Sequence, residues 1–176
     1  AKTLGKDIKD ITVIDVKDWI ASQNLYPDAK NDENYTSEDN LLNQFVTYHI
    51  IPQRIPVDKL VIHYNEKGYN YKNSTHYSVP VWTHFITMGK RRLVKTWQSV
   101  ESNGIYLNRF PVLDNGRHGT YHELSCDPEN EGIYLNTSAE SNVIKLINAM
   151  IYPIDKVLAY DDHTRDNLAR TRLRYD

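Results

Sequence analysis

The stretch LLNQFVTYHIIPQRIP, residues 41–56, decides how this chain of 176 residues is interpreted. Its first half carries side chains at the spacing of one helix face, namely Leu41, Leu42, Phe45, Val46 and His49. Thr36 and Asp39, just upstream, predict a start that resembles a capping box. We therefore expect an amphipathic helix that runs into the pair Tyr48-His49.

Two prolines end this helix. Pro52 lacks a backbone donor and pushes Ile51 out of the α region, and Pro56 makes a second break four residues later. The pattern predicts an abrupt change from helix to extended chain.

A helix that ends in Tyr-His and leads into apolar-Pro-x-Arg-apolar-Pro resembles the central motif of fasciclin-like domains. Residues 148–158, NAMIYPIDKVL, look like the closing strand of the same family. The long spacing and the tyrosine-rich insertions look most like the fasciclin-like surface proteins of gut Bacteroidetes. The resemblance rests on two groups of residues: Leu42, Phe45, Pro52, Arg54 and Pro56, then Asn148, Ile154, Asp155 and Leu158.

The resemblance implies an α+β fold, a twisted antiparallel sheet partly folded into a sandwich or wedge, with helices packed along one side. We expect one fasciclin-like domain over residues 1–176, with the helix 41–49 beneath the closing strand. Its core would span 12–158, with an inserted loop at 111–130 and a C-terminal extension at 159–176. The family's opening apolar-Ala-Pro-Thr-Asx motif is not found. We therefore expect that the first strand and helix are replaced or belong to a longer protein.

The other elements are predicted from local patterns. Thr12 and Asp15 form a capping box for a helix over 12–21, with Val13, Val16, Ile20 and Trp19 as its buried stripe. Strands are expected at 60–64, 79–87, 93–97 and at the two similar stretches 105–108 and 133–136, with a turn at Gly89. A short helix is expected from Ser138 through Ile147, and another over 165–175.

The composition of the chain limits the classes of partner that it is expected to bind. The 21 Lys and Arg residues nearly balance the 23 Asp and Glu residues, so charge favours neither nucleic acid nor an anionic membrane. No apolar run approaches the ~20 residues needed to span a bilayer, so we expect no direct insertion. The one cysteine, Cys126, excludes an internal disulfide. The 13 tyrosines beside 3 phenylalanines suit half-buried strands and contact surfaces.

The sequence gives only weak support for a metal site or for catalysis. His118, His122 and Cys126 are four residues apart and could bind zinc on a helix, but Gly116 and Gly119 argue against a helix there. The polar stretch 26–34 lacks the EF-hand spacing for calcium. Serine-hydrolase elbows and phosphate-binding glycine loops are not found in the sequence. We expect no metal, no cofactor and no catalytic residues.

Two clusters have more than one interpretation. Lys90, Arg91, Arg92 and Lys95 could contact an acidic polymer, but a charged turn that guards a strand edge is the simpler reading. Tyr48-His49 is the pair most often offered as an adhesion determinant in fasciclin-like domains. Alternatively, His49 is a core histidine whose ring holds the Pro52–Pro56 turn. We prefer the structural role.

The resemblance implies a non-catalytic adhesion or interaction module, exposed at the cell surface or anchored in a bacterial envelope beside further fasciclin-like domains. Its partner would be a protein or the extracellular matrix. The alternative is a glycan-binding module, and a metal-dependent hydrolase is less favoured. The candidate binding residues are Tyr48, His49, Tyr69, Tyr71, Tyr77 and Trp82.

Overall fold

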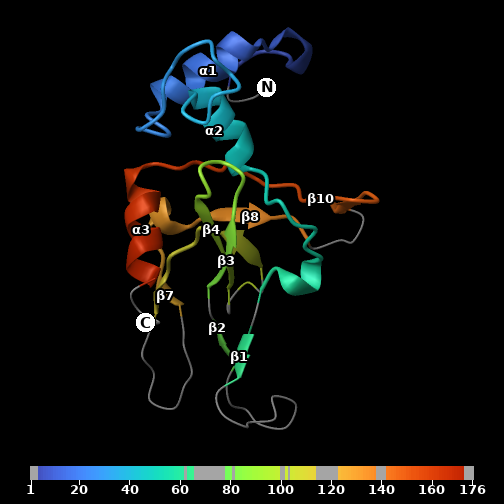
Figure 1. The fold of residues 1–176 in the computed structure, drawn as a ribbon. Coiled ribbons are helices and arrows are strands. Elements are labelled where there is room, and N and C mark those ends of the chain that lie inside the picture. The colour runs from blue at the N-terminus through green and yellow to red at the C-terminus, as the bar shows by residue number, and fades with distance from the viewer. Residues whose placement is uncertain are drawn as a thin grey trace. The chain divides into compact units, whose positions relative to one another are not determined.

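A computed structural model describes residues 4–61, 63–65, 78–80, 82–99, 102, 104–113, 123–137 and 142–172. It combines helices with antiparallel strand pairs, so the chain is an α+β protein (Figure 1). The chain divides into two compact units, residues 1–52, 86–92 and 158–176 in the first, and 53–85 and 93–157 in the second.

The first unit is helical. After a 3-10 turn at Ile8–Asp10, its helices are α1 (Val13–Ser22), α2 (Leu41–Tyr48) and α3 (Asp162–Arg172). The predicted capping box of α1 is confirmed, because the Asp15 N–H donates to Thr12 Oγ1 at 3.2 Å and the Thr12 N–H donates to Asp15 Oδ2 at 2.9 Å. The predicted buried stripe is only partly right. Ile20 is fully buried, whereas Val13 is 53% exposed.

Helix α2 forms where expected, but from a different cap. Asn40 precedes it, and the side-chain oxygen of Asn40 accepts hydrogen bonds from the N–H groups of Leu42 and Asn43. The predicted start from Thr36 and Asp39 is therefore wrong. Asn40 lies directly before the apolar run, where its short side chain can reach the first helical amides.

The inner face of α2 is also rotated from the predicted one. Its buried side chains are Leu41, Gln44 and Tyr48, whereas Val46 is 49% exposed and Leu42 and Phe45 are half-buried. The three buried residues lie at the spacing i, i+3 and i+7, which is one face of a helix. The apolar pattern missed this face because Gln44, a polar residue, lies at its centre.

The second unit is built on a four-stranded antiparallel sheet in the order β3-β4-β5-β8, whose members are β3 (Thr83–Ile86), β4 (Leu93–Gln98), β5 (Ile105–Leu107) and β8 (Ile133–Leu135). The predicted pairing around Gly89 is confirmed. Strand β4 is buried along its middle four residues, because it lies inside the sheet and both of its faces are covered.

The two similar stretches of sequence pair with each other. Tyr106 of β5 lies opposite Tyr134 of β8, and their rings are 5.4 Å apart. Gly132, just before β8, has φ +73°, and a Cβ there would lie 2.5 Å from the Leu107 carbonyl oxygen. The turn into β8 therefore requires glycine.

Three smaller strand pairs complete this unit, namely β1 (His63–Asn65) with β2 (Ser78–Pro80), β6 (Val112–Leu113) with β7 (Glu123–Ser125), and β9 (Ile144–Lys145) with β10 (Met150–Ile151). Two 3-10 turns, Val57–Lys59 and Pro128–Asn130, lie among them. The predicted loop at 111–130 thus contains β6, β7 and a 3-10 turn. The predicted helix through Ile147 is wrong over the described residues, because 144–151 form a hairpin.

The segment predicted as the closing strand pairs in two places. Met150 and Ile151 belong to the hairpin, whereas Ile154 bridges to Leu135 of β8. Asp155 adds a side-chain contact, since its Oδ1 accepts the Tyr134 N–H at 2.8 Å. The predicted strand is therefore present as short pieces. The exposed Pro153 lies between them, at a position without a backbone donor.

Candidate functional site

The first unit contains a tight turn that packs on α2. In this turn the Arg92 N–H donates to the Gly89 carbonyl at 3.0 Å, and Lys90 and Arg91 have φ values of +44° and +52°. Gly89 lies directly against the helix, because a Cβ there would be 2.6 Å from Thr47 Oγ1 and 3.1 Å from Tyr48 N. The turn thus combines close backbone packing with two non-glycine residues in a sparsely populated conformation.

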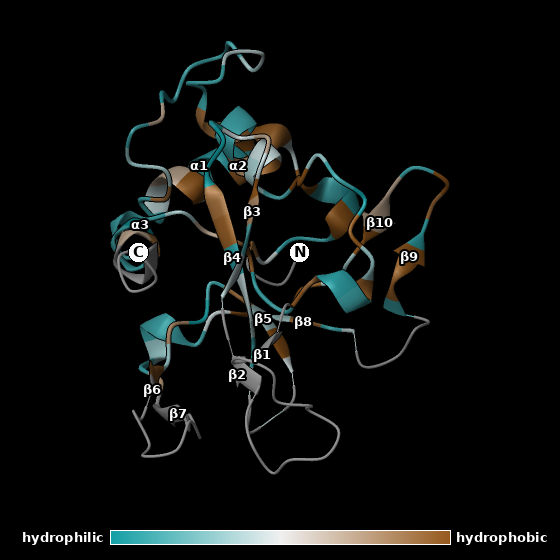
Figure 2. Cartoon of the chain, turned by 60° about the horizontal axis from the view of Figure 1, so that its bottom comes forward, coloured by the Kyte–Doolittle hydropathy of each residue, from teal (hydrophilic) through white to brown (hydrophobic). Residues whose placement is uncertain are grey.

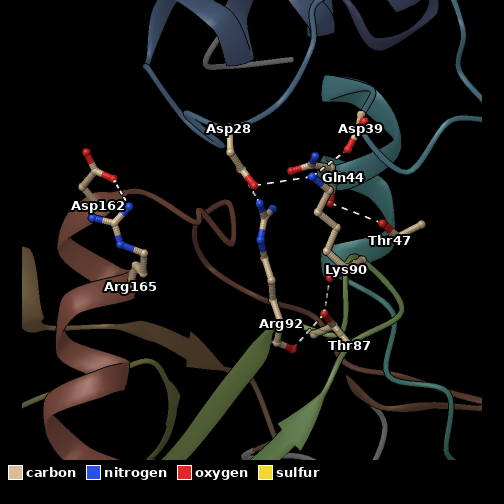
Figure 3. A network of polar contacts seen from close by, with 10 residues as sticks. Asp28, Asp39, Gln44, Thr47, Thr87, Lys90, Arg92, Asp162 and Arg165 are labelled. Carbon is tan, nitrogen blue, oxygen red and sulfur yellow. Dashed lines mark hydrogen bonds and ion pairs between the residues drawn. The ribbon is translucent and has the colours of Figure 1, made fainter.

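Ion pairs hold this turn to the loop before α2. Arg92 Nη2 lies 2.5 Å from Asp28 Oδ1, and Lys90 Nζ lies 2.8 Å from Asp39 Oδ1 and 3.5 Å from Asp28 Oδ2 (Figure 3). The hydrogen bond to Asp39 and the charges of Asp28 and Asp39 raise the pKa of Lys90. Burial favours a higher pKa for Asp28, but the nearby charges of Arg92 and Lys90 outweigh burial and lower it.

The predicted basic cluster is therefore not an exposed patch. Arg92 and Lys95 are only 8% and 5% exposed, and Lys90 is paired with two carboxylates. Only Arg91 has an exposed side chain. Lys90 and Arg91 are therefore best described as parts of a charged turn. The cluster exposes little positive charge that an acidic polymer could contact.

Two tyrosines lie against the Arg92 guanidinium, and a third packs on those two. The guanidinium carbon lies 4.2 Å from the centre of the Tyr160 ring and 5.3 Å from that of Tyr26. The Tyr48 ring meets Tyr26 and Tyr160 edge to face, at 6.0 and 5.4 Å. Burial raises the pKa values of Tyr26 and Tyr160 above that of a free tyrosine. The cluster is a cation–π contact enclosed in aromatic side chains.

Tyr26 is held in an unusual backbone conformation. Its φ is +55°, which is uncommon for a bulky residue. Two hydrogen bonds to the C-terminal segment fix it, from Tyr26 N–H to the Tyr160 carbonyl at 2.8 Å and from Tyr26 Oη to the Leu158 carbonyl at 3.2 Å. Strain of this kind persists only where the surrounding contacts impose it.

Gln44 is the buried polar residue that sequence reasoning missed. Its side chain has no exposed surface, and neither Oε1 nor Nε2 has a hydrogen-bond partner among the described residues. Arg92 Nη1 is likewise buried and without a partner in the part of the chain that the structure describes. The only signal in the sequence is position, because Gln44 lies three residues after Leu41 and four before Tyr48.

The predicted pair Tyr48-His49 splits into two structural roles. Tyr48 is completely buried, so its ring is enclosed within the first unit. His49 as a whole residue is exposed, but its ring packs on the Phe45 ring and bridges two backbone groups, with Nδ1 2.7 Å from the Phe45 oxygen and Nε2 3.3 Å from the Leu158 nitrogen. These contacts fit a neutral ring that donates from Nδ1 and accepts at Nε2. Burial lowers the pKa of His49, against the opposing effect of the Phe45 carbonyl.

The bridge made by His49 differs from the predicted one. The sequence predicted that its ring holds the Pro52–Pro56 turn, but among the described residues the ring contacts the Phe45 carbonyl, in the last turn of α2, and the Leu158 N–H. The expected proximity of this helix to 150–158 is thus met at Leu158, which belongs to the same unit. Pro52, Arg54 and Pro56 have exposed side chains. The remaining residues of 150–158 belong to the second unit.

Of the predicted aromatic contact residues, only Trp82 lies with Tyr48 within the described residues. Trp82 is half-buried, its Nε1 donates to the Arg109 carbonyl at 2.8 Å, and its ring lies 4.5 Å from that of Trp97. It therefore packs inside the second unit. Tyr69, Tyr71 and Tyr77 lie outside the described residues, as do His118 and His122.

Among the described residues of the second unit, the exposed large apolar side chains gather on the β9–β10 hairpin. Ile147, at its tip, is 101% exposed, and Ile144, Leu146 and Ile151 are 52%, 45% and 49% exposed. Ile144 and Ile151 are directly paired across the two strands. Figure 2 shows brown, hydrophobic residues in both strands, beside the teal of Lys145 in β9. Four exposed aliphatic side chains thus lie within the eight residues 144–151.

In the described part of the chain, no three or more His, Cys, Asp or Glu side chains gather closely enough to hold a metal ion. Nor does any described helix have the length and apolar character to cross a bilayer. Cys126, the remaining member of the predicted zinc trio, is half-buried.

Comparison of the chain with protein-family models, curated proteins and solved structures finds no match.

Proposed function

We propose that the chain is a non-catalytic interaction module that binds a protein ligand through the β9–β10 hairpin. The observation that supports this is the exposure of Ile144, Leu146, Ile147 and Ile151 on one short hairpin. Contiguous exposed apolar side chains are unfavourable in water and are typical of surfaces that a partner covers. A fully exposed isoleucine at a tip is suited to enter a pocket on that partner.

The chemistry of the hairpin favours a protein over a sugar. Aliphatic side chains offer neither hydrogen bonds for hydroxyl groups nor a flat ring for stacking on a sugar. Trp82, the described aromatic candidate for such stacking, already packs on Trp97. An apolar pocket on a protein complements the hairpin better.

The proposal includes the family and the location. The motifs at 41–56 and 148–158, together with the α+β architecture, support a fasciclin-like domain. We infer from that resemblance an extracellular or envelope-anchored position. Antibody labelling of intact cells that express the full-length protein tests this position, and labelling only after the cells are broken would contradict it.

A binding experiment tests the hairpin. The purified chain is applied to arrays of extracellular proteins, of glycans and of lipid vesicles, and the Kd for the best ligand is compared with that of Ile147→Asp. Full burial of an isoleucine is worth about 1.5–3 kcal/mol, so the variant is expected to bind at least about 10-fold more weakly.

The matched control is Ile8→Asp, which changes an isoleucine of the other unit that is 81% exposed. It is expected to bind like the parent chain. If both variants lost the same amount of binding affinity, the binding would be general apolar adhesion, and a specific hairpin site would be contradicted. Selective binding to glycans or vesicles, unaffected by Ile147→Asp, would instead favour one of those partners.

A further inference from the structure

The loop between α1 and α2 carries the acceptor motif for attachment of a sugar to asparagine. This motif, Asn-x-Ser/Thr with any residue except proline in the middle, occurs three times in the sequence, at 34–36, 73–75 and 136–138. A glycan is bulky and polar, so it can be attached only where the asparagine lies on an accessible surface loop. The structure therefore decides which of the triplets suits the modification.

Asn34 meets this requirement. Asn34, Tyr35 and Thr36 are all exposed, and they lie in a loop outside the helices and strands. The Asn34 side chain has one polar contact among the described residues, in which the Thr36 hydroxyl donates to Asn34 Oδ1 at 3.0 Å. No hydrogen bond joins Asn34 Nδ2 to another described residue. Nδ2 is the atom that carries the sugar in an N-linked glycan, and it is the part of this side chain that the fold does not use.

The start of α2 holds the loop on both sides of Asn34. Asn40, the cap of α2, donates from Nδ2 to the Asp32 carbonyl at 2.9 Å, and Asn43 donates from Nδ2 to the Tyr35 carbonyl at 2.9 Å. The Asn34 N–H donates to Asp32 Oδ1 at 3.0 Å. All these contacts to Asn34 and its neighbours use backbone groups. A glycan on Asn34 Nδ2 therefore displaces no contact of the folded chain.

Asn136, in contrast, is tied into the second unit. Its N–H donates to the Pro153 carbonyl at 3.0 Å, and its Oδ1 accepts from Asn142 Nδ2 at 2.8 Å. Its neighbour Leu135, the last residue of β8, is only 3% exposed. Modification of Asn136 would thus disturb packed structure, whereas modification of Asn34 would not. The triplet at 73–75 lies outside the described residues.

We propose that Asn34 is an N-glycosylation site, modified by an oligosaccharyltransferase with a lipid diphosphate-linked oligosaccharide as donor. Asn34 Nδ2 forms a bond to the anomeric carbon of the first sugar, while the bond from that carbon to the diphosphate oxygen breaks. The lipid diphosphate leaves with the electron pair of the broken bond, and Nδ2 gives one of its two protons to a base of the transferase. The inference rests on the extracellular or envelope position proposed above, because this reaction is confined to exported chains.

Mass spectrometry tests the site on the full-length protein, purified from the cells that naturally produce it. The tryptic peptide 31–54 is expected to carry a glycan on Asn34. Asn34→Gln removes the acceptor and Thr36→Val removes the hydroxyl of the motif, so both variants, produced in the same cells, are expected to lose the glycan from this peptide. Thr36→Ser keeps a hydroxyl and is expected to retain the glycan. Asn136→Gln is the matched control and is expected to leave the modification of Asn34 unchanged.

The opposite results overturn the inference. They are an unmodified Asn34 in the parent protein, a glycan on this peptide that persists in Thr36→Val, or a glycan attached to a hydroxyl group in place of Asn34. Antibody labelling of the same cells shows whether the proposed position fails as well. Labelling of intact cells together with an unmodified Asn34 contradicts the glycosylation site alone, whereas labelling only after the cells are broken, with Asn34 unmodified, contradicts both.

Discussion

Replacement of His49 tests whether its ring ties the end of α2 to the C-terminal segment. The ring lies 2.7 Å from the Phe45 oxygen and 3.3 Å from the Leu158 nitrogen, and Leu158 is only 4% exposed. His49→Ala removes both hydrogen bonds and leaves the Leu158 N–H short of a partner. A lost hydrogen bond costs about 1 kcal/mol net, and a buried N–H without a partner costs about 1–3 kcal/mol.

These values set the expected size of the effect. Because the ring is accessible, water can replace part of what it provides, and we expect His49→Ala to lower the free energy of unfolding by about 1–3 kcal/mol. For a chain of 176 residues this corresponds to a decrease in the unfolding midpoint of about 2–12 °C. The exposed His84 supplies the control, since His84→Ala is expected to change the midpoint little.

The same residue predicts a dependence on pH. The pKa of His49 is lowered in the folded chain, so the unfolded chain binds the proton more readily. The stabilisation is complete above the unfolded pKa of about 6.5 and is lost as the pH falls through the lower folded pKa. Protonation also removes the lone pair at Nε2 that accepts the Leu158 N–H.

His49→Gln separates the two effects, because a carboxamide can donate and accept but does not titrate. The assay is thermal unfolding by circular dichroism between about pH 4.5 and 8, with hydrogen exchange at the Leu158 amide as a local readout. The stability of the parent relative to His49→Gln is expected to decrease toward acid pH, and His49→Ala is expected to speed exchange at Leu158. A difference that stays constant with pH, together with unchanged exchange at Leu158, would refute the bridge.

Three further changes test the packing of the first unit, each by chemical denaturation. Gly89→Ala places a Cβ 2.6 Å from Thr47 Oγ1 and close to the α2 backbone, so it should cost about 1–3 kcal/mol; an unchanged stability would show that the turn does not pack on the helix. Leu41→Ala, at a buried site, should lower the free energy of unfolding by about 2–5 kcal/mol, and Val46→Ala, at an exposed site, by less than about 1 kcal/mol. A larger loss for Val46→Ala than for Leu41→Ala would indicate that the apolar face predicted from the sequence is the buried one. Phe45→Ala should cost about 1–3 kcal/mol, because the Phe45 ring is half-buried against Tyr26 and His49; a loss of about 3–5 kcal/mol, typical of a fully buried aromatic side chain, would indicate that the ring is more buried.

Local signals predicted the elements whose determinants lie close together in sequence. The capping box of Thr12 and Asp15 requires two residues three apart, and the turn at Gly89 lies between the alternating stretch 79–87 and the nearby stretch 93–97. Both were found where expected. The helix predicted through Ile147 failed because Ile144 and Ile147 have helical spacing by coincidence, whereas a short hairpin uses the same residues at its strand and tip.

The candidate sites depend on contacts that no local pattern contains. Arg92 and Asp28 are 64 residues apart, and His49 and Leu158 are 109 residues apart. The face of α2 was predicted incorrectly because hydrophobic periodicity treats every polar residue as solvent-facing, and Gln44 is buried. Exposure of the β9–β10 hairpin was missed for the complementary reason, since a run of isoleucine and leucine is normally assigned to a core.

The pairing of β5 with β8 has a consequence for how copies of the chain meet. The sequence Ile-Tyr-Leu occurs in both strands, and the two occurrences lie antiparallel, with each isoleucine opposite a leucine. Because the two paired strands have the same sequence, each can form the same antiparallel pair with the corresponding strand of another molecule. During folding at high concentration, strand exchange between chains therefore competes with correct closure, and dilute refolding should yield more monomer than concentrated refolding.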